Sequence, residues 1–111
     1  MSQKYCLVYS TCPESGNYSS IISQQLIESK LAACVNIVDN ITSVYTWNQQ
    51  ITTSREHLLI IKTTLLLFEK VKEKILALHP YACPEIIAVP IIHGASGYIS
   101  WLNSCLLPVN A

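Results

Sequence analysis

Charged side chains are scarce in this chain of 111 residues. Only 13% of the residues are charged, and seven Lys or Arg balance seven Asp or Glu, so the formal net charge is zero. No cluster of Lys and Arg occurs anywhere along the chain. Binding to nucleic acid depends on a basic surface that neutralises phosphates. We therefore expect no nucleic-acid partner.

The chain also lacks segments that would direct it into or across a membrane. No apolar run approaches the roughly 20 residues that a membrane-spanning helix needs, and the first residues lack the basic and apolar regions of a signal peptide. Five cysteines occur without a C-x-x-C pair or the spacing of a zinc ribbon or finger. We expect a cytoplasmic protein without a membrane partner, whose thiols are reduced and mostly buried.

Hydrophobic residues, by contrast, make up half of the chain. A chain of this length forms one domain and buries roughly 65% of its unfolded surface. So small an interior cannot hold this much apolar surface, and apolar patches left outside usually mark contacts between subunits. We expect a single domain over residues 1–111 that assembles into a homo-oligomer.

The spacing of the apolar residues predicts alternating strands and helices. Phe68, Val71, Ile75 and Leu78 recur as on one face of an amphipathic helix, and Pro80 ends that helix by disfavouring helical backbone before it. Runs rich in Val, Ile, Leu and Tyr predict strands. The expected strands cover residues 4–11, 33–38 and 51–63, with a second extended run at 43–47 after the strand at 33–38, and the expected helices lie at 18–29 and 68–78.

One turn and one reversal of the chain are expected among these segments. One is a turn at Asp39 and Asn40, and the other is a hairpin at residues 48–50. The resulting order of strand, helix, strand, strand, helix and strand is the split βαβ pattern of the ferredoxin-like fold. We therefore predict an α+β protein, a βαββαβ sandwich with a short extra C-terminal helix.

The segment from His79 to Leu102, HPYACPEIIAVPIIHGASGYISWL, supplies the last strand and that extra helix. Pro90 lies inside the apolar run at residues 86–92. Because proline cannot donate a hydrogen bond to a neighbouring strand, it is confined to edge strands and bulges. The last strand must therefore end or bend at Pro90. The residues after Gly97, Tyr98 to Leu102, predict a short helix that closes the fold.

Four pieces of the sequence, in order and at matching distances, resemble the CutA family of divalent-cation tolerance proteins. They are KLAACVN at 30–36, SVYTW at 43–47, Glu56 with Lys62-Thr63, and the segment 79–102 with its HPY, PEI and YISWL motifs. The resemblance implies a ferredoxin-like subunit assembled through its sheets into a homotrimer, similar in architecture to the PII signalling proteins. It also implies a role in the tolerance of copper or other divalent cations.

This chain departs from the family pattern at two places. Family members commonly carry Gly two residues after the hairpin tryptophan, where this chain has Gln49. The copper ligands proposed in the family include a cysteine at the end of the first strand and paired histidines before Pro-Tyr. Those positions here hold Ser10, Leu78 and His79. Only His79 carries over, and Cys12 is a substitute shifted by two residues.

The loop after the second predicted helix holds the candidates for a metal site. His79 and Cys83 offer borderline and soft ligands that suit copper or zinc. A tight site normally needs three or four converging ligands. Two interpretations stay open: weak binding of copper or another divalent cation at His79 and Cys83, or a structural loop in which Pro80 ends the helix and Tyr81 packs.

A second group of candidates combines aromatic, acidic and basic side chains. On the predicted hairpin two aromatic residues share one face, and the acid and the base share parity on the return strand. Such a group suits a small-molecule cleft between subunits. It equally suits an interface alone, with the acid and base as a buried ion pair. The residues are Tyr45, Trp47, Glu56, Lys62 and Trp101.

Motifs of catalysis are missing from the chain. It has no Gly-rich phosphate loop, no G-x-S-x-G elbow and no H-E-x-x-H helix. We expect a protein that is not an enzyme. The first hypothesis is a trimeric metal-binding or metal-response protein of copper tolerance. The alternative is a PII-like signalling or scaffold trimer that binds a small ligand in its inter-subunit cleft.

Overall fold

The computed structural model describes residues 4–108 and confirms the predicted α+β architecture. Within these residues the elements follow in the order βαββαβ, with one further helix at the end. A 3-10 turn at Leu65–Leu67 leads into the second helix. The elements are β1 (Tyr5–Pro13), α1 (Tyr18–Glu28), β2 (Cys34–Trp47), β3 (Gln50–Thr64), α2 (Phe68–Leu78), β4 (Ile87–Pro90) and α3 (Ser96–Ser104).

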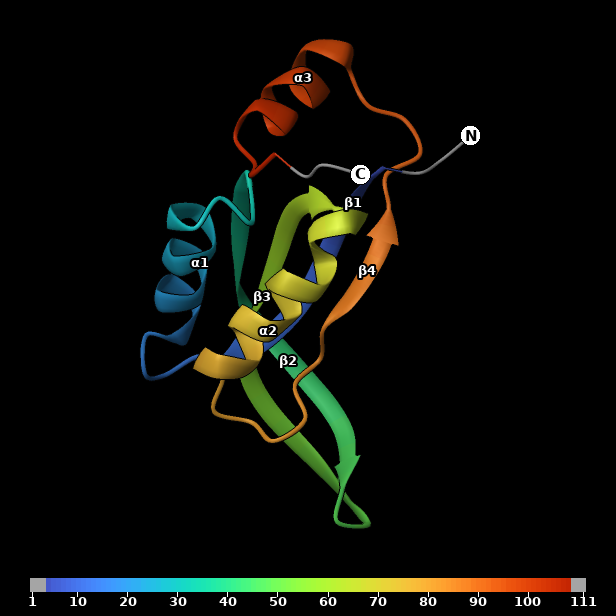
Figure 1. Ribbon diagram of the computed structural model, residues 1–111. Helices are drawn as coiled ribbons and strands as arrows, with labels where there is room; N and C mark the ends of the chain where they lie inside the picture. The colour runs from blue at the N-terminus through green and yellow to red at the C-terminus, as the bar shows by residue number, and fades with distance from the viewer. Residues whose placement is uncertain (1–3, 109–111) are drawn as a thin grey trace.

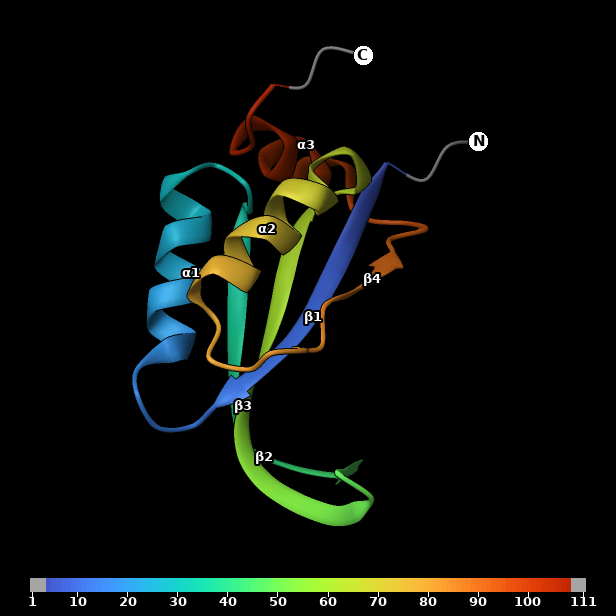
Figure 2. The ribbon, with the colours of Figure 1, turned by 60° about the horizontal axis from the view of Figure 1, so that its bottom comes forward.

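The strands form one antiparallel sheet in the order β2-β3-β1-β4. Helices α1 and α2 lie side by side over one face of this sheet, and α3 lies at one end of it (Figures 1 and 2). The β2–β3 hairpin extends beyond the other end. In the described part of the chain, no helix covers the opposite face of the sheet.

The hydrophobic core lies between the sheet and the two helices. Strand β1 buries every second residue, from Cys6 to Cys12, against the helices, as expected for a strand covered on one face. Leu59 and Ile61 of β3 lie on the same face. Each large aliphatic side chain buried here contributes about 1.5–3 kcal/mol to the free energy of folding. The helices contribute Ile22, Leu26, Val71 and Ile75, and α3 adds Leu102.

The face of the sheet without helices is also apolar. Tyr9 pairs with Ile60 on one side and with Ile87 on the other, and all three side chains point away from α1 and α2. Ile87 is 50% exposed, and Val89 in the same strand is 39% exposed. This surface, which we call the open face, is the apolar surplus that the composition predicts.

Strand β4 confirms the prediction about Pro90. It is an edge strand that pairs only with β1, and Pro90 is its last residue, opposite Cys6. The missing N–H of proline therefore leaves no bond unmade within the sheet. The amide of the next residue, Ile91, donates to the carbonyl of Tyr5 at 2.9 Å.

The predicted turn at Asp39 and Asn40 is wrong, because β2 continues through it as a β-bulge. Val38 pairs with Leu58 and Ile41 pairs with Glu56, so two residues of β2 oppose one residue of β3. Asn40 adopts a left-handed backbone with φ 61°, which asparagine tolerates better than most residues. In a sequence, a turn and a β-bulge are marked by the same kinds of residue, so the pair Asp39-Asn40 does not distinguish between them.

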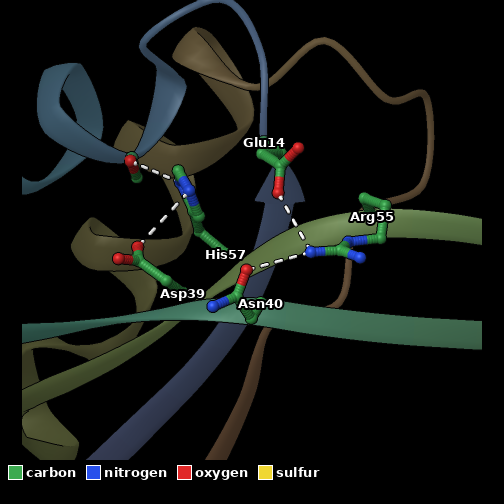
Figure 3. A network of polar contacts seen from close by, with 6 residues as sticks. Glu14, Asp39, Asn40, Arg55 and His57 are labelled. Carbon is green, nitrogen blue, oxygen red and sulfur yellow. Dashed lines mark hydrogen bonds and ion pairs between the residues drawn. The ribbon is translucent and has the colours of Figure 1, made fainter.

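Polar contacts hold the bulge on both sides (Figure 3). Arg55 donates to the Asn40 side chain at 2.9 Å and lies 3.7 Å from the Glu14 carboxylate. His57 lies between the Ser19 hydroxyl at 2.8 Å and the Asp39 carboxylate at 3.5 Å. The His57 side chain is 19% exposed. The register pairs His57 with buried Cys12, on the helix-covered face.

The β2–β3 hairpin closes through a two-residue turn at Asn48 and Gln49. Trp47 pairs with Gln50, and the two turn residues have φ 52° and 65°. Two consecutive residues of positive φ are typical of a type I′ turn, whose twist matches that of the strands. The Cβ of Gln49 makes this left-handed conformation strained, whereas glycine, which has no Cβ, adopts it without strain.

We expect Gln49→Gly to raise the free energy of unfolding by about 1 kcal/mol, because it relieves the left-handed strain at this residue. Urea denaturation followed by circular dichroism measures the change. The control is Gln50→Gly, one residue later, where the backbone is extended and glycine lowers stability by about 0.5–1 kcal/mol. Equal effects of the two variants would contradict the strain at Gln49.

Candidate functional site

A pocket of about 490 Å³ opens where the β2–β3 hairpin meets the loop at residues 79–86. This volume lies within the range of roughly 300–1,000 Å³ that is typical of small-molecule sites. Three segments far apart in the sequence form its walls: the end of β1, the hairpin, and the loop. The side chains that matter for its chemistry are Thr11, Ser43, Tyr45, Trp47, Glu56, Tyr81, Cys83 and Glu85.

The bulge decides which hairpin side chains face this pocket. Before it, even-numbered residues of β2 lie opposite even-numbered residues of β3, as Val38 does opposite Leu58. After it, odd-numbered residues take their place: Ile41 lies opposite Glu56, and Tyr45 lies opposite Thr52. One extra residue therefore moves Tyr45 and Trp47 to the face of Glu56.

Glu56 is the buried carboxylate of the pocket and is only 3% exposed, whereas Glu85, which also lines the pocket, is exposed. The phenol of Tyr81 donates a hydrogen bond to Oε2 of Glu56 at 2.9 Å. No other side-chain hydrogen bond to this carboxylate occurs among residues 4–108. Burying a carboxylate with so few partners is costly unless a further partner is supplied.

Tyr81 is held as a hydrogen-bond donor by its surroundings. Burial raises its pKa well above the usual value for tyrosine, and the hydrogen bond to Glu56 and the charge of that carboxylate raise it further. Each of these effects disfavours the phenolate. Tyr81 therefore stays protonated through neutral and mildly alkaline pH and keeps donating to Glu56.

His79 connects this loop to strand β1. Its Nε2 donates to the carbonyl of Thr11 at 2.7 Å, and its Nδ1 accepts from the amide of Tyr81 at 3.1 Å. Since a carbonyl only accepts and an amide only donates, the ring is the neutral tautomer with the proton on Nε2. Both ring nitrogens are in use, and the ring packs against Tyr81 with centroids 4.8 Å apart.

The structure brings together only part of the predicted cleft within one chain. Tyr45, Trp47 and Glu56 line the pocket. Lys62 lies six residues from Glu56, roughly 20 Å along the strand, and its ammonium contacts the Asn36 side chain and the Cys34 sulfur. Glu56 and Lys62 therefore form no ion pair within the described chain, and a pair between subunits stays a prediction. Trp101, on α3, packs against Tyr98 with ring centroids 5.5 Å apart.

The predicted metal ligands are separated in a similar way. Cys83 is exposed at the pocket, whereas His79 points toward β1 with both nitrogens bonded. Ser10 and Cys12 face the core, and burial, helped by the charge of Glu56, raises the pKa of Cys12 to about 11. This favours the thiol over the thiolate that binds metals.

No preformed metal centre follows from these positions. The part of the chain that the structure describes contains no group of three or more His, Cys, Asp or Glu side chains arranged to hold a metal ion. Metal sites of high affinity normally need three or four such ligands. The assignment of a metal to His79 and Cys83 stays a prediction that the contacts of His79 do not favour.

The contact between Tyr81 and Glu56 is absent from the sequence-based candidates. The two residues are 25 positions apart and meet because the loop crosses the end of β1. No periodicity or motif encodes such a crossing. Two separate features of the sequence could have pointed to this contact: the HPY motif and an acidic residue in an apolar strand.

Comparison with known proteins agrees with the fold and the motifs. The model of the CutA1 divalent ion tolerance protein family matches residues 6–105. A protein of Thermus thermophilus described as divalent-cation tolerance protein CutA is 49% identical over 82 residues, which are 74% of this chain and 80% of that protein. The chain belongs to the CutA1 family. The match spans the segments at residues 30–36, 43–47 and 79–102, on which the resemblance rests.

Solved structures of CutA1 proteins share the fold closely. CutA1 from Oryza sativa superimposes with a TM-score of 0.91 at 40% identity, covering 96% of each chain. The Thermus thermophilus protein has a TM-score of 0.88 at 42% identity, covering 92% of this chain and 98% of that one. The chloroplastic CutA of Arabidopsis thaliana is 43% identical over 100 residues, 88% of this chain, and this chain spans about half of its length.

We expect Tyr81→Phe to lower the free energy of unfolding by about 2 kcal/mol, because it leaves the buried Glu56 carboxylate without its donor. Urea denaturation at neutral pH measures this loss. The matched control is Tyr45→Phe, which removes a 2.7 Å hydrogen bond to Ser54 at an exposed position and costs less than about 1 kcal/mol. A loss no larger than in the control would contradict the role of Tyr81.

Proposed function

We propose that this member of the CutA1 family is a homotrimeric protein of divalent-cation tolerance that works by binding a small ligand in the pocket at Glu56. The observation that carries the proposal is the pocket itself, with a buried carboxylate at its base and aromatic walls. The pocket supports the PII-like alternative more strongly than a dedicated copper centre, because no three His, Cys, Asp or Glu side chains of the described residues are arranged to hold a metal ion.

A role without catalysis is part of this proposal. The relatives are named for tolerance of divalent cations and not for a reaction. Among residues 4–108, no hydrogen bond joins a Ser or Thr hydroxyl or the Cys thiol of the pocket to a base, and both ring nitrogens of His79 are bonded to the backbone. We also retain the cytoplasm as the proposed compartment. Similar proteins differ in this respect, since one from Archaeoglobus fulgidus is described as periplasmic and the plant relatives as chloroplastic. No helix among residues 4–108 is long and apolar enough to cross a membrane.

The open face supports assembly into a trimer. Its apolar side chains lie on the side of the sheet that α1 and α2 leave uncovered. Exposed apolar patches of this kind are typical of interfaces between subunits. The pocket opens on the same face of the sheet, because Thr11 and Glu56 share the parity of Tyr9 and Ile60. Assembly through this face would therefore bring a second copy close to the pocket.

We expect Ile60→Lys to shift the protein from trimer to monomer, because it puts a charge at the centre of the open face. Sedimentation velocity measures the change. The control is Leu76→Lys, which places the same charge at a half-exposed position of α2, on the other side of the molecule, and leaves the assembly unchanged. An unchanged sedimentation coefficient for Ile60→Lys would argue against assembly through this face.

Direct binding of copper is the second candidate function, and the exposed thiol of Cys83 at the pocket favours it. Glu85, two residues later, also lines the pocket. His79 can join a metal only by giving up the Tyr81 amide at Nδ1 or the Thr11 carbonyl at Nε2. Two ligands on one exposed loop predict weak binding.

We expect calorimetric titration of Cu(II) and Zn(II) into reduced, metal-free protein to show binding weaker than micromolar. Cys83→Ser should weaken it further, whereas His79→Ala should leave it unchanged, because the ring nitrogens already have partners. Saturable binding of micromolar or higher affinity that is lost in His79→Ala would instead make this a metal-binding protein with its site at the HPY loop.

A further inference from the structure

We infer that the ligand of the pocket at Glu56 is an organic cation, a protonated or quaternary amine, with the Glu56 carboxylate as its counter-ion. The inference rests on the proposed function, that is, on the pocket being a small-molecule site, and specifies the chemical class of its ligand. Charge, shape and the kind of side chains present each point to this class.

The charge of the pocket is unbalanced. Two carboxylates, Glu56 and Glu85, line it, and none of the described lining residues is Lys, Arg or His. The basic residues of the same strand are engaged elsewhere: Arg55, next to Glu56, contacts Asn40 and Glu14, and the more distant Lys62 contacts Asn36. The buried carboxylate of Glu56 therefore meets one neutral hydroxyl and no cation of the described chain.

A cationic ligand would supply the missing partner. A carboxylate taken out of water is costly unless it is paired, and an ion pair shielded from solvent is stronger than one on the surface. An anionic ligand would meet repulsion from both carboxylates. A neutral ligand would cover Glu56 and leave it unpaired, which makes such a complex less favourable.

The aromatic walls favour an organic cation over a metal ion. Tyr45, Trp47 and Tyr81 come from two different segments and line the same pocket. The hydroxyls of Tyr45 and Ser54 share a hydrogen bond of 2.7 Å, which orients that ring. Aromatic faces attract ammonium groups by about 0.5–2 kcal/mol each, and groups of such rings are the usual receptors of quaternary ammonium ions.

The size and the ligand set favour an organic molecule over an inorganic ion as the natural occupant. A volume of about 490 Å³ suits a molecule of many atoms. Hard divalent cations take six or more oxygen ligands, and no described group of three acidic, His or Cys side chains converges here. An amine needs only one well-placed carboxylate and apolar surroundings, and the pocket provides both.

Two ligands of the same shape test the inference by calorimetry on the full-length protein. Choline carries the positive charge, and 3,3-dimethylbutan-1-ol is its uncharged isostere. We expect saturable binding of choline and at least about tenfold weaker binding of the alcohol, because only choline pairs with Glu56. Glu56→Gln should weaken choline binding by about tenfold or more, since the amide oxygen still accepts from Tyr81 but carries no charge.

A second pair of variants keeps the test independent of any loss of folding in Glu56→Gln. Trp47 is 54% exposed on the hairpin, and Trp101 is 46% exposed on α3, away from the pocket. Trp47→Leu should weaken choline binding by about threefold or more through the loss of a cation–π contact. Trp101→Leu is the matched control and should leave the affinity unchanged.

The other outcomes separate the two claims. If the alcohol binds as tightly as choline, or if neither Glu56→Gln nor Trp47→Leu weakens choline binding, the cation inference is overturned while the pocket stands as a small-ligand site. If neither compound binds to the wild-type protein, both the cation inference and the ligand-binding function proposed for the pocket are overturned.

Discussion

One extra residue in strand β2 determines which side chains this protein presents at its pocket. The bulge at Asp39 and Asn40 shifts the pairing of β2 by one position relative to β3, so that Tyr45 and Trp47 lie on the face of Glu56. Without that residue the two aromatic side chains would point to the opposite face, because side chains alternate along a strand. Contacts from Arg55 to Asn40 and from Asp39 to His57 hold the bulge, and His57 in turn contacts Ser19 at the start of α1. The geometry of the pocket thus depends on a local defect that is anchored to the rest of the fold.

The loop between α2 and β4 completes the pocket through a short series of hydrogen bonds. The Thr11 carbonyl accepts from His79, His79 accepts from the Tyr81 amide, and the Tyr81 hydroxyl donates to Glu56. Each bond orients the next group, so the HPY motif links β1 to the hairpin. This explains the motif as a positioning device. A histidine whose two nitrogens are both bonded is poorly placed to bind a metal, and the same bonds keep Tyr81 over the buried carboxylate.

The two faces of the sheet have different roles. One is covered by α1 and α2 and forms a conventional core. The other is apolar, lacks a covering helix in the described chain, and continues into the pocket. The two proposals follow from this difference between the faces. The proposed trimer would cover the open face, and the proposed organic cation would neutralise Glu56. Both proposals place the function on the side of the sheet that a single chain leaves incomplete.

The sequence by itself determined the order of the elements, the CutA1 family and the edge position of the last strand. These depend on local rules: apolar spacing defined α2 from Phe68 to Leu78, and Pro90 has no N–H to donate. It also singled out Tyr45, Trp47 and Glu56, which lie together in one chain, along with Lys62 and Trp101, which lie elsewhere in that chain. Only the tertiary structure decided that Asp39 and Asn40 form a bulge and that Tyr81 covers Glu56. Register between strands and the path of a loop across a sheet depend on contacts between residues far apart in the chain, and local patterns carry no record of those contacts.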